Sequence, residues 1–404
     1  MAKVAILGFG NIGSGVLEVL QHNAALIARR AGQDVTVKYI CDIRNFSAHP
    51  NAKLFVNNID VILNDPEVQV VVETIGGTKP AYFYVKSALE SGRHVVTSNK
   101  ELVATHGAEL LQIARDKGVC FLFEASVGGG TPVITPMYQC LAANMLTGIS
   151  GIVNGTTNYM LTKMAAENMS FDAALASAQQ LGYAETIDPS ADVDGIDAQR
   201  KISILASLAF GTEVHPANVR TTGIRKVTVQ DIAAAEKLGA AVKLIAWAKR
   251  TEKGTVACGV QPMLVPAAHL LAGVQDVFNA VLVSGDMLGD VVFYGKGAGK
   301  LPTASAVVAD VIDALKNGTQ IHNGLFWQAS PALDGYMDDT APAAWYVRAD
   351  GTAAEAEAAF DGAVVLSEEE GTVLFTVHGI TNDVLAAAAA AAGLPVQNAM
   401  QFMA

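Results

Sequence analysis

The strongest constraint on the fold is a glycine pattern near the N-terminus. A short apolar run at residues 4–7 ends in Gly8-Phe9-Gly10-Asn11-Ile12-Gly13, and an amphipathic helical pattern follows. Between a strand and a helix, the first glycine allows a tight turn, the second lets a pyrophosphate approach the backbone, and the third lets helix and strand pack closely. Backbone N–H groups at the helix N-terminus then bind the phosphates. The segment predicts a dinucleotide site; a purely structural glycine turn is the alternative.

Strand-like and helical segments alternate after this glycine loop. Apolar runs at residues 35–41, 68–73, 94–97 and 119–123 are separated by helical patterns. The alternation predicts an α/β fold with a Rossmann-type, doubly wound parallel sheet and helices on both faces. This first domain is predicted at residues 1–130, completed by a helix that packs back onto it at about residues 300–320.

Two further domains are predicted in the rest of the chain. Residues 131–330 mix strand and helix patterns, which favours an α+β domain that binds the substrate. Residues 343–404 follow the order βαββαβ, which is typical of a small separate domain.

Composition excludes several function classes. The formal net charge of −12, without clustered Lys and Arg, argues against a nucleic-acid surface. The four cysteines (Cys41, Cys120, Cys140 and Cys258) form no C-x-x-C pair, so neither a zinc site nor a disulfide framework is expected. No leader pattern is visible, and no apolar run reaches the roughly 18 residues that span a bilayer. We expect a cytoplasmic protein without a membrane or nucleic-acid partner.

Two residues at the end of the second strand-like run bear on the type of dinucleotide. Asp42 takes the place of the acidic residue that hydrogen-bonds the ribose 2′-hydroxyl in NAD-binding proteins, although it lies further from Gly13 than the usual spacing of about 20 residues. Arg44, two residues on, suits the 2′-phosphate of NADP. The sequence therefore leaves NAD and NADP open.

An acidic segment leads into a lysine. Within 13 residues the chain carries Glu185, Asp188, Asp192, Asp194 and Asp197, and Lys201 follows. Asp197 and Lys201 are spaced i and i+4 on an apolar helix, so they share a face. A lysine with a lowered pKa can accept the proton of an alcohol during oxidation, and carboxylates suit a substrate amino group. The alternative is a solvated loop with an ordinary surface salt bridge.

A second lysine lies where parallel sheets bind ligands. The stretch Ser98-Asn99-Lys100-Glu101 follows the carboxyl end of a predicted strand. Lys100 is therefore a second candidate for proton chemistry or charge stabilisation. An exposed lysine at the start of a helix is the alternative.

Two more glycine-rich segments are candidate contacts. Residues 124–132 follow a strand, and such a run can bring backbone groups close to a cofactor, a substrate or a hard cation. Residues 295–299 precede the helix at residues 302–317 and could touch the cofactor. An interdomain hinge and a plain loop are the respective alternatives.

Together these segments resemble the homoserine dehydrogenase family, in order, over about the first 320 residues. The resemblance is carried by residues 8–13, 98–100, 124–132, 154–159, 182–185, 197–201, 297–299 and 302–307. The Asn-Gly-Thr-Thr-Asn stretch at residues 154–158 and the Asp197-x-x-x-Lys201 helix are the most specific in combination.

The resemblance implies an NAD(P)-dependent oxidoreductase that interconverts L-homoserine and L-aspartate 4-semialdehyde, in threonine, methionine and isoleucine biosynthesis. Lys201 is similar to the family's proton donor and acceptor, and Lys100 to its second essential lysine. The residues implied to bind the substrate are Glu185, Asp192, Asp197, Gly155 and Thr156. The residues implied to bind the cofactor are Gly8, Phe9, Gly10, Asn11, Ile12, Gly13, Asp42, Arg44, Thr74, Ser98, Lys100 and Gly299.

The resemblance also implies a cation and an oligomer. Glu124, Val127, Gly129 and Thr131 match a monovalent cation site, usually sodium, that is built mainly of backbone carbonyls. The family dimerises through its middle domain, so we expect residues 131–330 to form a homodimer or homotetramer.

The last domain resembles the ACT fold, which binds amino acids. It departs from the pattern, because Ala349-Asp350-Gly351-Thr352 stands where an acidic-x-Pro-Gly turn is usual. Feedback by threonine and a packing or dimerising role both stay open.

Two competing functions lack their sequence features. An aspartate-semialdehyde dehydrogenase needs a nucleophilic cysteine near a histidine, a setting that none of the cysteines has. A redox-sensing regulator with NAD and ACT modules is expected to carry a basic DNA-binding element, and the sequence shows none.

Overall fold

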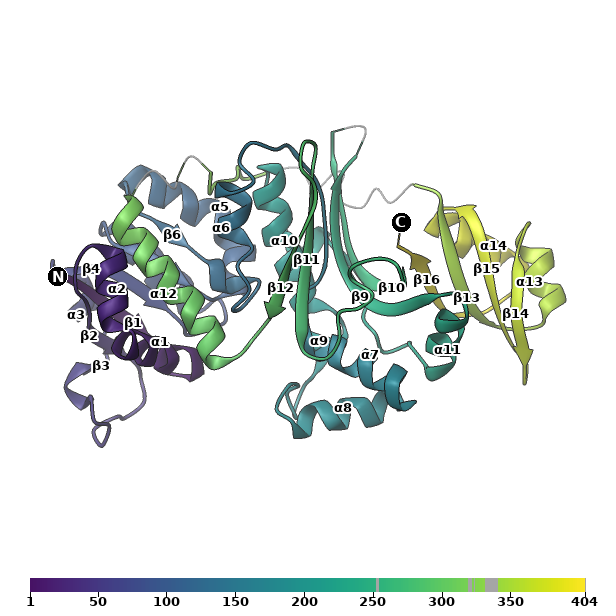
Figure 1. Cartoon of the computed structure of the whole chain (residues 1–404), viewed down its shortest axis with the longest axis horizontal. Coiled ribbons are helices and arrows are strands. Elements are labelled where there is room, and N and C mark those ends of the chain that lie inside the picture. The colour runs from purple at the N-terminus through teal and green to yellow at the C-terminus, as the bar shows by residue number, and fades with distance from the viewer. Residues whose placement is uncertain (252–253, 319–321, 323, 331–340, 404) are drawn as a thin grey trace. The chain divides into compact units, whose positions relative to one another are not determined.

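The computed structural model describes residues 1–251, 254–318, 322, 324–330 and 341–403. The chain divides into two compact units (Figure 1). Unit 1 comprises Met1–Thr147, Ser203–Pro216 and Val283–Ala332. Unit 2 comprises Gly148–Ile202, Ala217–Leu282 and Leu333–Ala404. The three domain limits expected from the sequence stay predictions.

Unit 1 is built on a six-stranded sheet in the order β3-β2-β1-β4-β5-β6, in which every neighbouring pair is parallel. Its strands are β1 (Ala2–Leu7), β2 (Val35–Cys41), β3 (Phe55–Val56), β4 (Val68–Glu73), β5 (His94–Thr97) and β6 (Phe121–Leu122). β1 and β4 are apolar on both faces because helices cover both sides of the sheet. The predicted doubly wound parallel sheet is confirmed.

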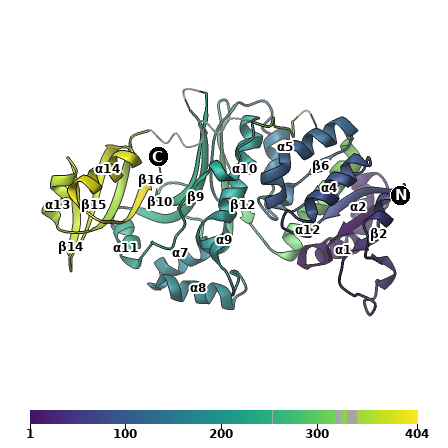
Figure 2. The ribbon, with the colours of Figure 1, turned by 180° about the vertical axis from the view of Figure 1, so that it is seen from behind.

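Two groups of helices cover this sheet (Figures 1 and 2). On one face lie α1 (Asn11–His22), α2 (Ala24–Ala31) and α12 (Lys300–Asn317), and on the other α4 (Ala81–Glu90) and α5 (Lys100–Lys117). The short helices of the unit are η1 (Ala52–Leu54), α3 (Asp60–Leu63), η2 (Glu124–Ser126) and α6 (Ile134–Gln139). α12 packs so tightly on α1 that a Cβ on Gly15 would lie 3.1 Å from Ala304 Cβ.

A second sheet of ten strands has the order β12-β11-β7-β9-β10-β16-β13-β15-β14, with β8 paired to β10. Its strands before residue 300 are β7 (Leu146–Ile152), β8 (Arg220–Thr221), β9 (Ala240–Arg250), β10 (Val256–Pro266), β11 (Phe278–Gly285) and β12 (Gly289–Lys296). The accompanying helices are α7 (Gly155–Glu167), α8 (Phe171–Gln180), α9 (Ser190–Val193), α10 (Ile196–Phe210), η3 (Pro216–Asn218) and α11 (Val229–Lys237).

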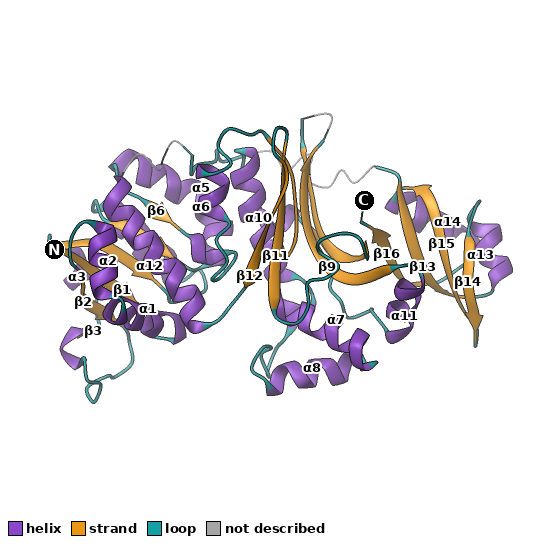
Figure 3. Cartoon of the chain, in the orientation of Figure 1, coloured by secondary structure: helices purple, strands orange, loops and turns teal. Residues whose placement is uncertain are grey.

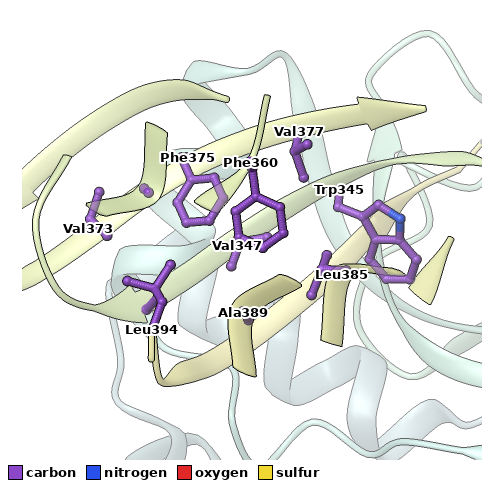
Figure 4. Close-up of a cluster of buried hydrophobic side chains, with 11 residues drawn as sticks. Trp345, Val347, Phe360, Val373, Phe375, Val377, Leu385, Ala389 and Leu394 are labelled. Carbon is purple, nitrogen blue, oxygen red and sulfur yellow. The ribbon is translucent and has the colours of Figure 1, made fainter. Parts of the chain in front are cut away.

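The C-terminal module, residues 341–403, has the predicted order βαββαβ. It contains β13 (Ala343–Asp350), α13 (Ala353–Ala359), β14 (Val364–Glu369), β15 (Thr372–Ile380), α14 (Asn382–Ala392) and β16 (Val396–Phe402). The helices lie against the strands (Figure 3), and buried side chains such as Val347, Phe375 and Leu385 fill the space between them (Figure 4). β16 pairs in parallel with β10, which joins the module to the rest of the sheet.

None of the helices described is long and apolar enough to cross a membrane.

Candidate active site

The glycine loop of unit 1 has the geometry that the pattern predicts. Gly8 lies at φ 87°, and a Cβ there would lie 3.0 Å from the Thr74 carbonyl oxygen. A Cβ on Gly13 would lie 2.1 Å from the Gly8 oxygen, whereas one on Gly10 would meet no atom within 4 Å. Gly10 therefore leaves open space in front of the α1 N-terminus. Thr74, one of the predicted cofactor residues, donates from Oγ1 to the Gly8 carbonyl at 2.9 Å and steadies the loop.

Asp42 and Arg44 form a pair at the end of β2. Asp42 Oδ2 accepts the Phe9 N–H at 2.7 Å and Arg44 Nη2 at 2.8 Å, while Oδ1 accepts Arg44 Nε at 3.0 Å. The hydrogen bond from Arg44 lowers the pKa of Asp42 to about 2, so the carboxylate is ionised at any working pH. The Asp42 side chain is 6% exposed and that of Arg44 is 57% exposed. The guanidinium is therefore the group that this pair presents to solvent.

Glu73 is a buried acid that the sequence patterns do not point to, and it links the loop after β4 to the end of β5. Glu73 is fully buried; its Oε2 accepts Thr97 Oγ1 at 2.5 Å and its Oε1 accepts the Ile75 N–H at 2.7 Å. Burial raises the pKa of Glu73. Its only sequence signal is an acidic residue at the carboxyl end of an apolar run.

Next to it, Asn99 caps α5 by accepting the Leu102 N–H at 3.1 Å and donates from Nδ2 to the Gly77 carbonyl at 2.6 Å. These contacts place Ser98 before α5 and Lys100 in its first turn. Gly299, another predicted cofactor residue, is the N-cap of α12 in the same unit.

The glycine-rich segment at residues 124–131 starts with a capping carboxylate. Glu124 Oε1 accepts the N–H groups of Val133 and Ile134 at 2.6 and 2.9 Å, and Oε2 accepts that of Thr135 at 2.6 Å. The side chain of Glu124 thus satisfies the N-terminus of α6. What Glu124 can offer a cation is its backbone carbonyl.

The same segment has a donor set that suits a monovalent cation. Val127 and Thr131 are almost fully buried. Within the part of the chain that the structure describes, no backbone N–H outside helices and strands donates to the carbonyls of Val127, Gly129 or Thr131. Over the same residues Ser126 Oγ is buried and lacks a hydrogen-bond partner. Oxygen donors of this kind fit a hard cation.

The residues that the structure describes contain no group of three or more His, Cys, Asp or Glu side chains that could hold a metal ion.

In unit 2 the predicted lysine and carboxylate meet as a buried pair. Lys201 Nζ lies 2.8 Å from Asp197 Oδ2 and donates to the Val153 carbonyl at 2.7 Å. Lys201 is 7% exposed and Asp197 is 6% exposed. An ordinary surface salt bridge on α10 does not have this burial, so the solvated-loop alternative is wrong for this pair.

Asn154 connects this pair to a second carboxylate. Its Nδ2 donates to Asp192 Oδ1 at 2.7 Å and to Asp197 Oδ2 at 2.9 Å. Its Oδ1 accepts the Thr157 N–H at 2.8 Å and caps α7. Gly155 and Thr156 therefore form the first turn of a helix whose N-cap side chain touches both aspartates. We call Asn154, Asp192, Asp197 and Lys201 the lysine–carboxylate cluster.

The other acidic residues of the segment lie outside this cluster. Glu185 is exposed in the loop between α8 and α9, and its carbonyl accepts Gln179 Nε2 at 2.9 Å. Asp188 is also exposed, and Asp194 pairs with Arg225 at 2.5 Å. The predicted cofactor and cation residues, with Lys100, belong to unit 1, and the predicted substrate residues, with Lys201, belong to unit 2.

Comparisons with known proteins point to one family. A family model described as the NAD-binding domain of homoserine dehydrogenase matches residues 8–124, and one described as homoserine dehydrogenase matches residues 132–312. The homoserine dehydrogenase of Synechocystis sp. is 44% identical over 344 residues, which cover 84% of this chain and 77% of that protein. The homoserine dehydrogenase of Pseudomonas aeruginosa is 45% identical over 315 residues, which cover 78% and 72%.

Solved structures extend the similarity to the whole chain. A homoserine dehydrogenase from Thiobacillus denitrificans superposes with a TM-score of 0.88 at 35% identity, covering 100% of this chain and 98% of that one. A hyperthermophilic archaeal homoserine dehydrogenase, solved in complex with NADPH, superposes with a TM-score of 0.65 at 27% identity and covers 78% of this chain and 97% of its own. The chain belongs to the homoserine dehydrogenase family.

Proposed function

We propose that Lys201 is the acid–base group of the homoserine dehydrogenase reaction in this chain. The observation that carries the proposal is the burial of its ammonium group between Asp197 and the Val153 carbonyl. As a neutral amine, Lys201 accepts the hydroxyl proton of L-homoserine; as an ammonium, it is stabilised by Asp197 at 2.8 Å. In the reverse direction it returns the proton to the oxygen of the semialdehyde.

The bound nicotinamide cofactor supplies the acceptor for the hydride that leaves C4 of homoserine. The residues of the chain orient the substrate for this transfer. We assign its α-ammonium group to the carboxylates Asp192 and Asp197, and its carboxylate to the N–H groups of Gly155 and Thr156 at the start of α7. For Glu185, which is exposed, and for Lys100 in the first turn of α5, the support is the family resemblance.

We further propose that the chain favours NADP over NAD. Asp42 uses both carboxylate oxygens on Phe9 and Arg44, and its charge is balanced by Arg44. The exposed guanidinium suits a 2′-phosphate better than a ribose hydroxyl. Gly8 to Gly13, with Thr74, Ser98 and Gly299, are assigned to the rest of the cofactor.

Initial rates of homoserine-dependent reduction, measured with each cofactor, test this preference. We expect a higher kcat/KM with NADP⁺, and Arg44→Ala lowers it by about 10- to 100-fold, because a hydrogen bond to a charged group contributes about 1.5–3 kcal/mol. With NAD⁺ the same variant changes little. Arg30→Ala, at another exposed arginine of unit 1, is the control. A parent that does not favour NADP⁺ contradicts the preference, and an unchanged NADP⁺/NAD⁺ ratio in Arg44→Ala contradicts the role of Arg44. No reduction by the parent with either cofactor contradicts the activity.

A monovalent cation, with sodium as the candidate, is proposed at the carbonyls of Glu124, Val127, Gly129 and Thr131. Its support is the buried, carbonyl-rich geometry of the segment. A cation there orders the chain between β6 and α6.

Thermal unfolding in two salts tests whether sodium binds at this site. Sodium at about ten times its Kd adds about 1.4 kcal/mol to the free energy of unfolding, which raises Tm of a chain of this length by about 2 °C. Tetramethylammonium at the same ionic strength is too large for a carbonyl cage and is expected to leave Tm unchanged. Identical melting curves in the two salts would remove the cation from the proposal.

Oligomerisation through the middle domain, a cytoplasmic location, the absence of nucleic-acid and membrane partners, and amino-acid binding by the C-terminal module stay predictions.

A further inference from the structure

One backbone carbonyl of unit 2 holds two buried side chains at once. The Val153 oxygen, just after β7, accepts Lys201 Nζ at 2.7 Å and Asn279 Nδ2 at 3.0 Å. Asn279 lies on β11 and is 2% exposed. Because a carbonyl oxygen has two lone pairs, both hydrogen bonds form together. The amide of Asn279 therefore lies beside the lysine of the lysine–carboxylate cluster.

The other end of this amide is an unused acceptor. Over the described ranges, Asn279 Oδ1 is buried and has no hydrogen-bond partner. Buried polar side chains in native proteins are almost always paired, and an unpaired one carries the full cost of losing its water. A bound molecule with a hydrogen-bond donor at this position removes that cost.

A clamp of buried side chains fixes the backbone that leads into Asn279. Asn158 Nδ2 donates to three carbonyl oxygens within residues 274–278, at 2.9 to 3.3 Å. Lys243 Nζ donates to Asn158 Oδ1 at 3.2 Å and to the Val274 carbonyl at 2.5 Å. Both side chains of the clamp are at least nine-tenths buried. The direction of the Asn279 side chain is thus set before a substrate arrives, as a preorganised site requires.

We propose that Asn279 is a positioning and specificity residue of the homoserine reaction. Its Nδ2 holds the Val153 carbonyl, and through it Lys201, while its Oδ1 accepts a hydrogen bond from the α-ammonium group of the substrate. The substrate offers two donors, the ammonium and the C4 hydroxyl. The hydroxyl gives its proton to Lys201, whereas the ammonium is a donor in both directions of the reaction. The inference rests on the proposed role of Lys201.

Steady-state kinetics of Asn279→Leu and Asn279→Asp test it, across pH values from about 6 to 10. Asn279→Leu keeps the shape and loses both hydrogen bonds, so we expect kcat/KM for L-homoserine to fall by about 10- to 100-fold while the Kd of NADPH is unchanged. Asn279→Asp keeps an acceptor for the ammonium but places a negative charge beside Lys201. That charge favours the ammonium form of Lys201, which must lose its proton before it can act as the base, so the acidic limb of the pH–kcat profile for homoserine oxidation moves up by about one unit or more.

Two further variants make the outcomes distinguishable. Asn398→Leu removes another buried asparagine of unit 2, one that contacts Asp231 and lies outside the cluster; it is expected to alter Tm and leave the pH profile unchanged. Lys201→Met tests the proposed function itself. If Asn279→Leu and Asn279→Asp behave like Asn398→Leu while Lys201→Met is inactive, the inference is wrong and the role of Lys201 stands. If Lys201→Met turns over normally, the acid–base assignment is wrong as well. Should Asn279→Leu fail to fold, the pH profile of Asn279→Asp decides.

Discussion

Replacing Lys201 by methionine will lower kcat for L-homoserine by about 10²- to 10⁴-fold, the usual contribution of a general acid–base group. Methionine keeps the unbranched shape of lysine but cannot accept a proton. The site is buried, and Lys201 contacts Asp197 and the Val153 carbonyl. The rate of NADPH formation, followed through the absorbance of NADPH, measures the effect.

The cofactor should still bind to this variant. The glycine loop, Asp42 and Arg44 all belong to unit 1, whereas Lys201 belongs to unit 2, so the Kd of NADPH is expected to stay within about twofold. Lys163→Met is a matched control, because Lys163 also forms an i,i+4 pair, with Glu167 at 2.6 Å, but on the surface. Its turnover is expected to match that of the parent. Near-normal turnover of Lys201→Met, in a protein that binds NADPH, would falsify the acid–base role.

Local patterns explain why the first sheet could be predicted. The glycine loop needs only residues within one turn of each other, and buried parallel strands appear as continuous apolar runs. β2, β4 and β5 accordingly lie where the sequence places them. The predicted helix at residues 302–317 forms as α12 and contacts α1.

Tertiary contacts explain what the sequence did not show. The sequence has a helical pattern over residues 134–146, but α6 ends at Gln139 and β7 begins at Leu146. The chain turns because Asn144 donates to the Leu141 carbonyl and accepts a hydrogen bond from the Leu288 N–H. Leu288 lies 144 positions further along the chain. β9, rich in Ala, Leu and Lys, was not predicted as a strand; its place between β7 and β10 overrides its propensity.

The candidate site, like the fold, was predictable only where its contacts are local in sequence. The spacing of Asp197 and Lys201 on one helix predicts their contact, and the structure confirms it. Asn154 contacts this pair, and Asn279 the carbonyl beside it, from positions far away in sequence; Asn279 and Val153 are 126 residues apart. One sequence carries no signal for such a pairing. The expected role of Glu124 in cation binding stays a prediction, but its side chain has another task at α6.

The largest effect on stability is expected from Asp231→Ala, where α11 meets the C-terminal module. Asp231 is fully buried and accepts hydrogen bonds from Tyr346 at 2.8 Å, Arg348 Nε at 2.9 Å and Asn398 at 3.1 Å. Its removal leaves the guanidinium of Arg348, which is 7% exposed, without its carboxylate. Breaking a buried ion pair in this way costs about 3–5 kcal/mol. The free energy of unfolding and the hydrogen exchange of β10 and β16 measure the effect.

Asp231→Ala also removes a helix cap, and Glu355→Ala is the control that measures the effect of losing a cap alone. Asp231 and Glu355 each close a capping box, with Thr228 on α11 and Thr352 on α13, but Glu355 is exposed. Loss of the surface cap is expected to cost about 1 kcal/mol and to leave exchange of β16 unchanged. The additional loss of stability in Asp231→Ala, beyond that in Glu355→Ala, therefore measures how strongly side chains hold the module to the sheet. If the two variants are equally stable, the backbone pairing of β10 with β16 alone anchors the module.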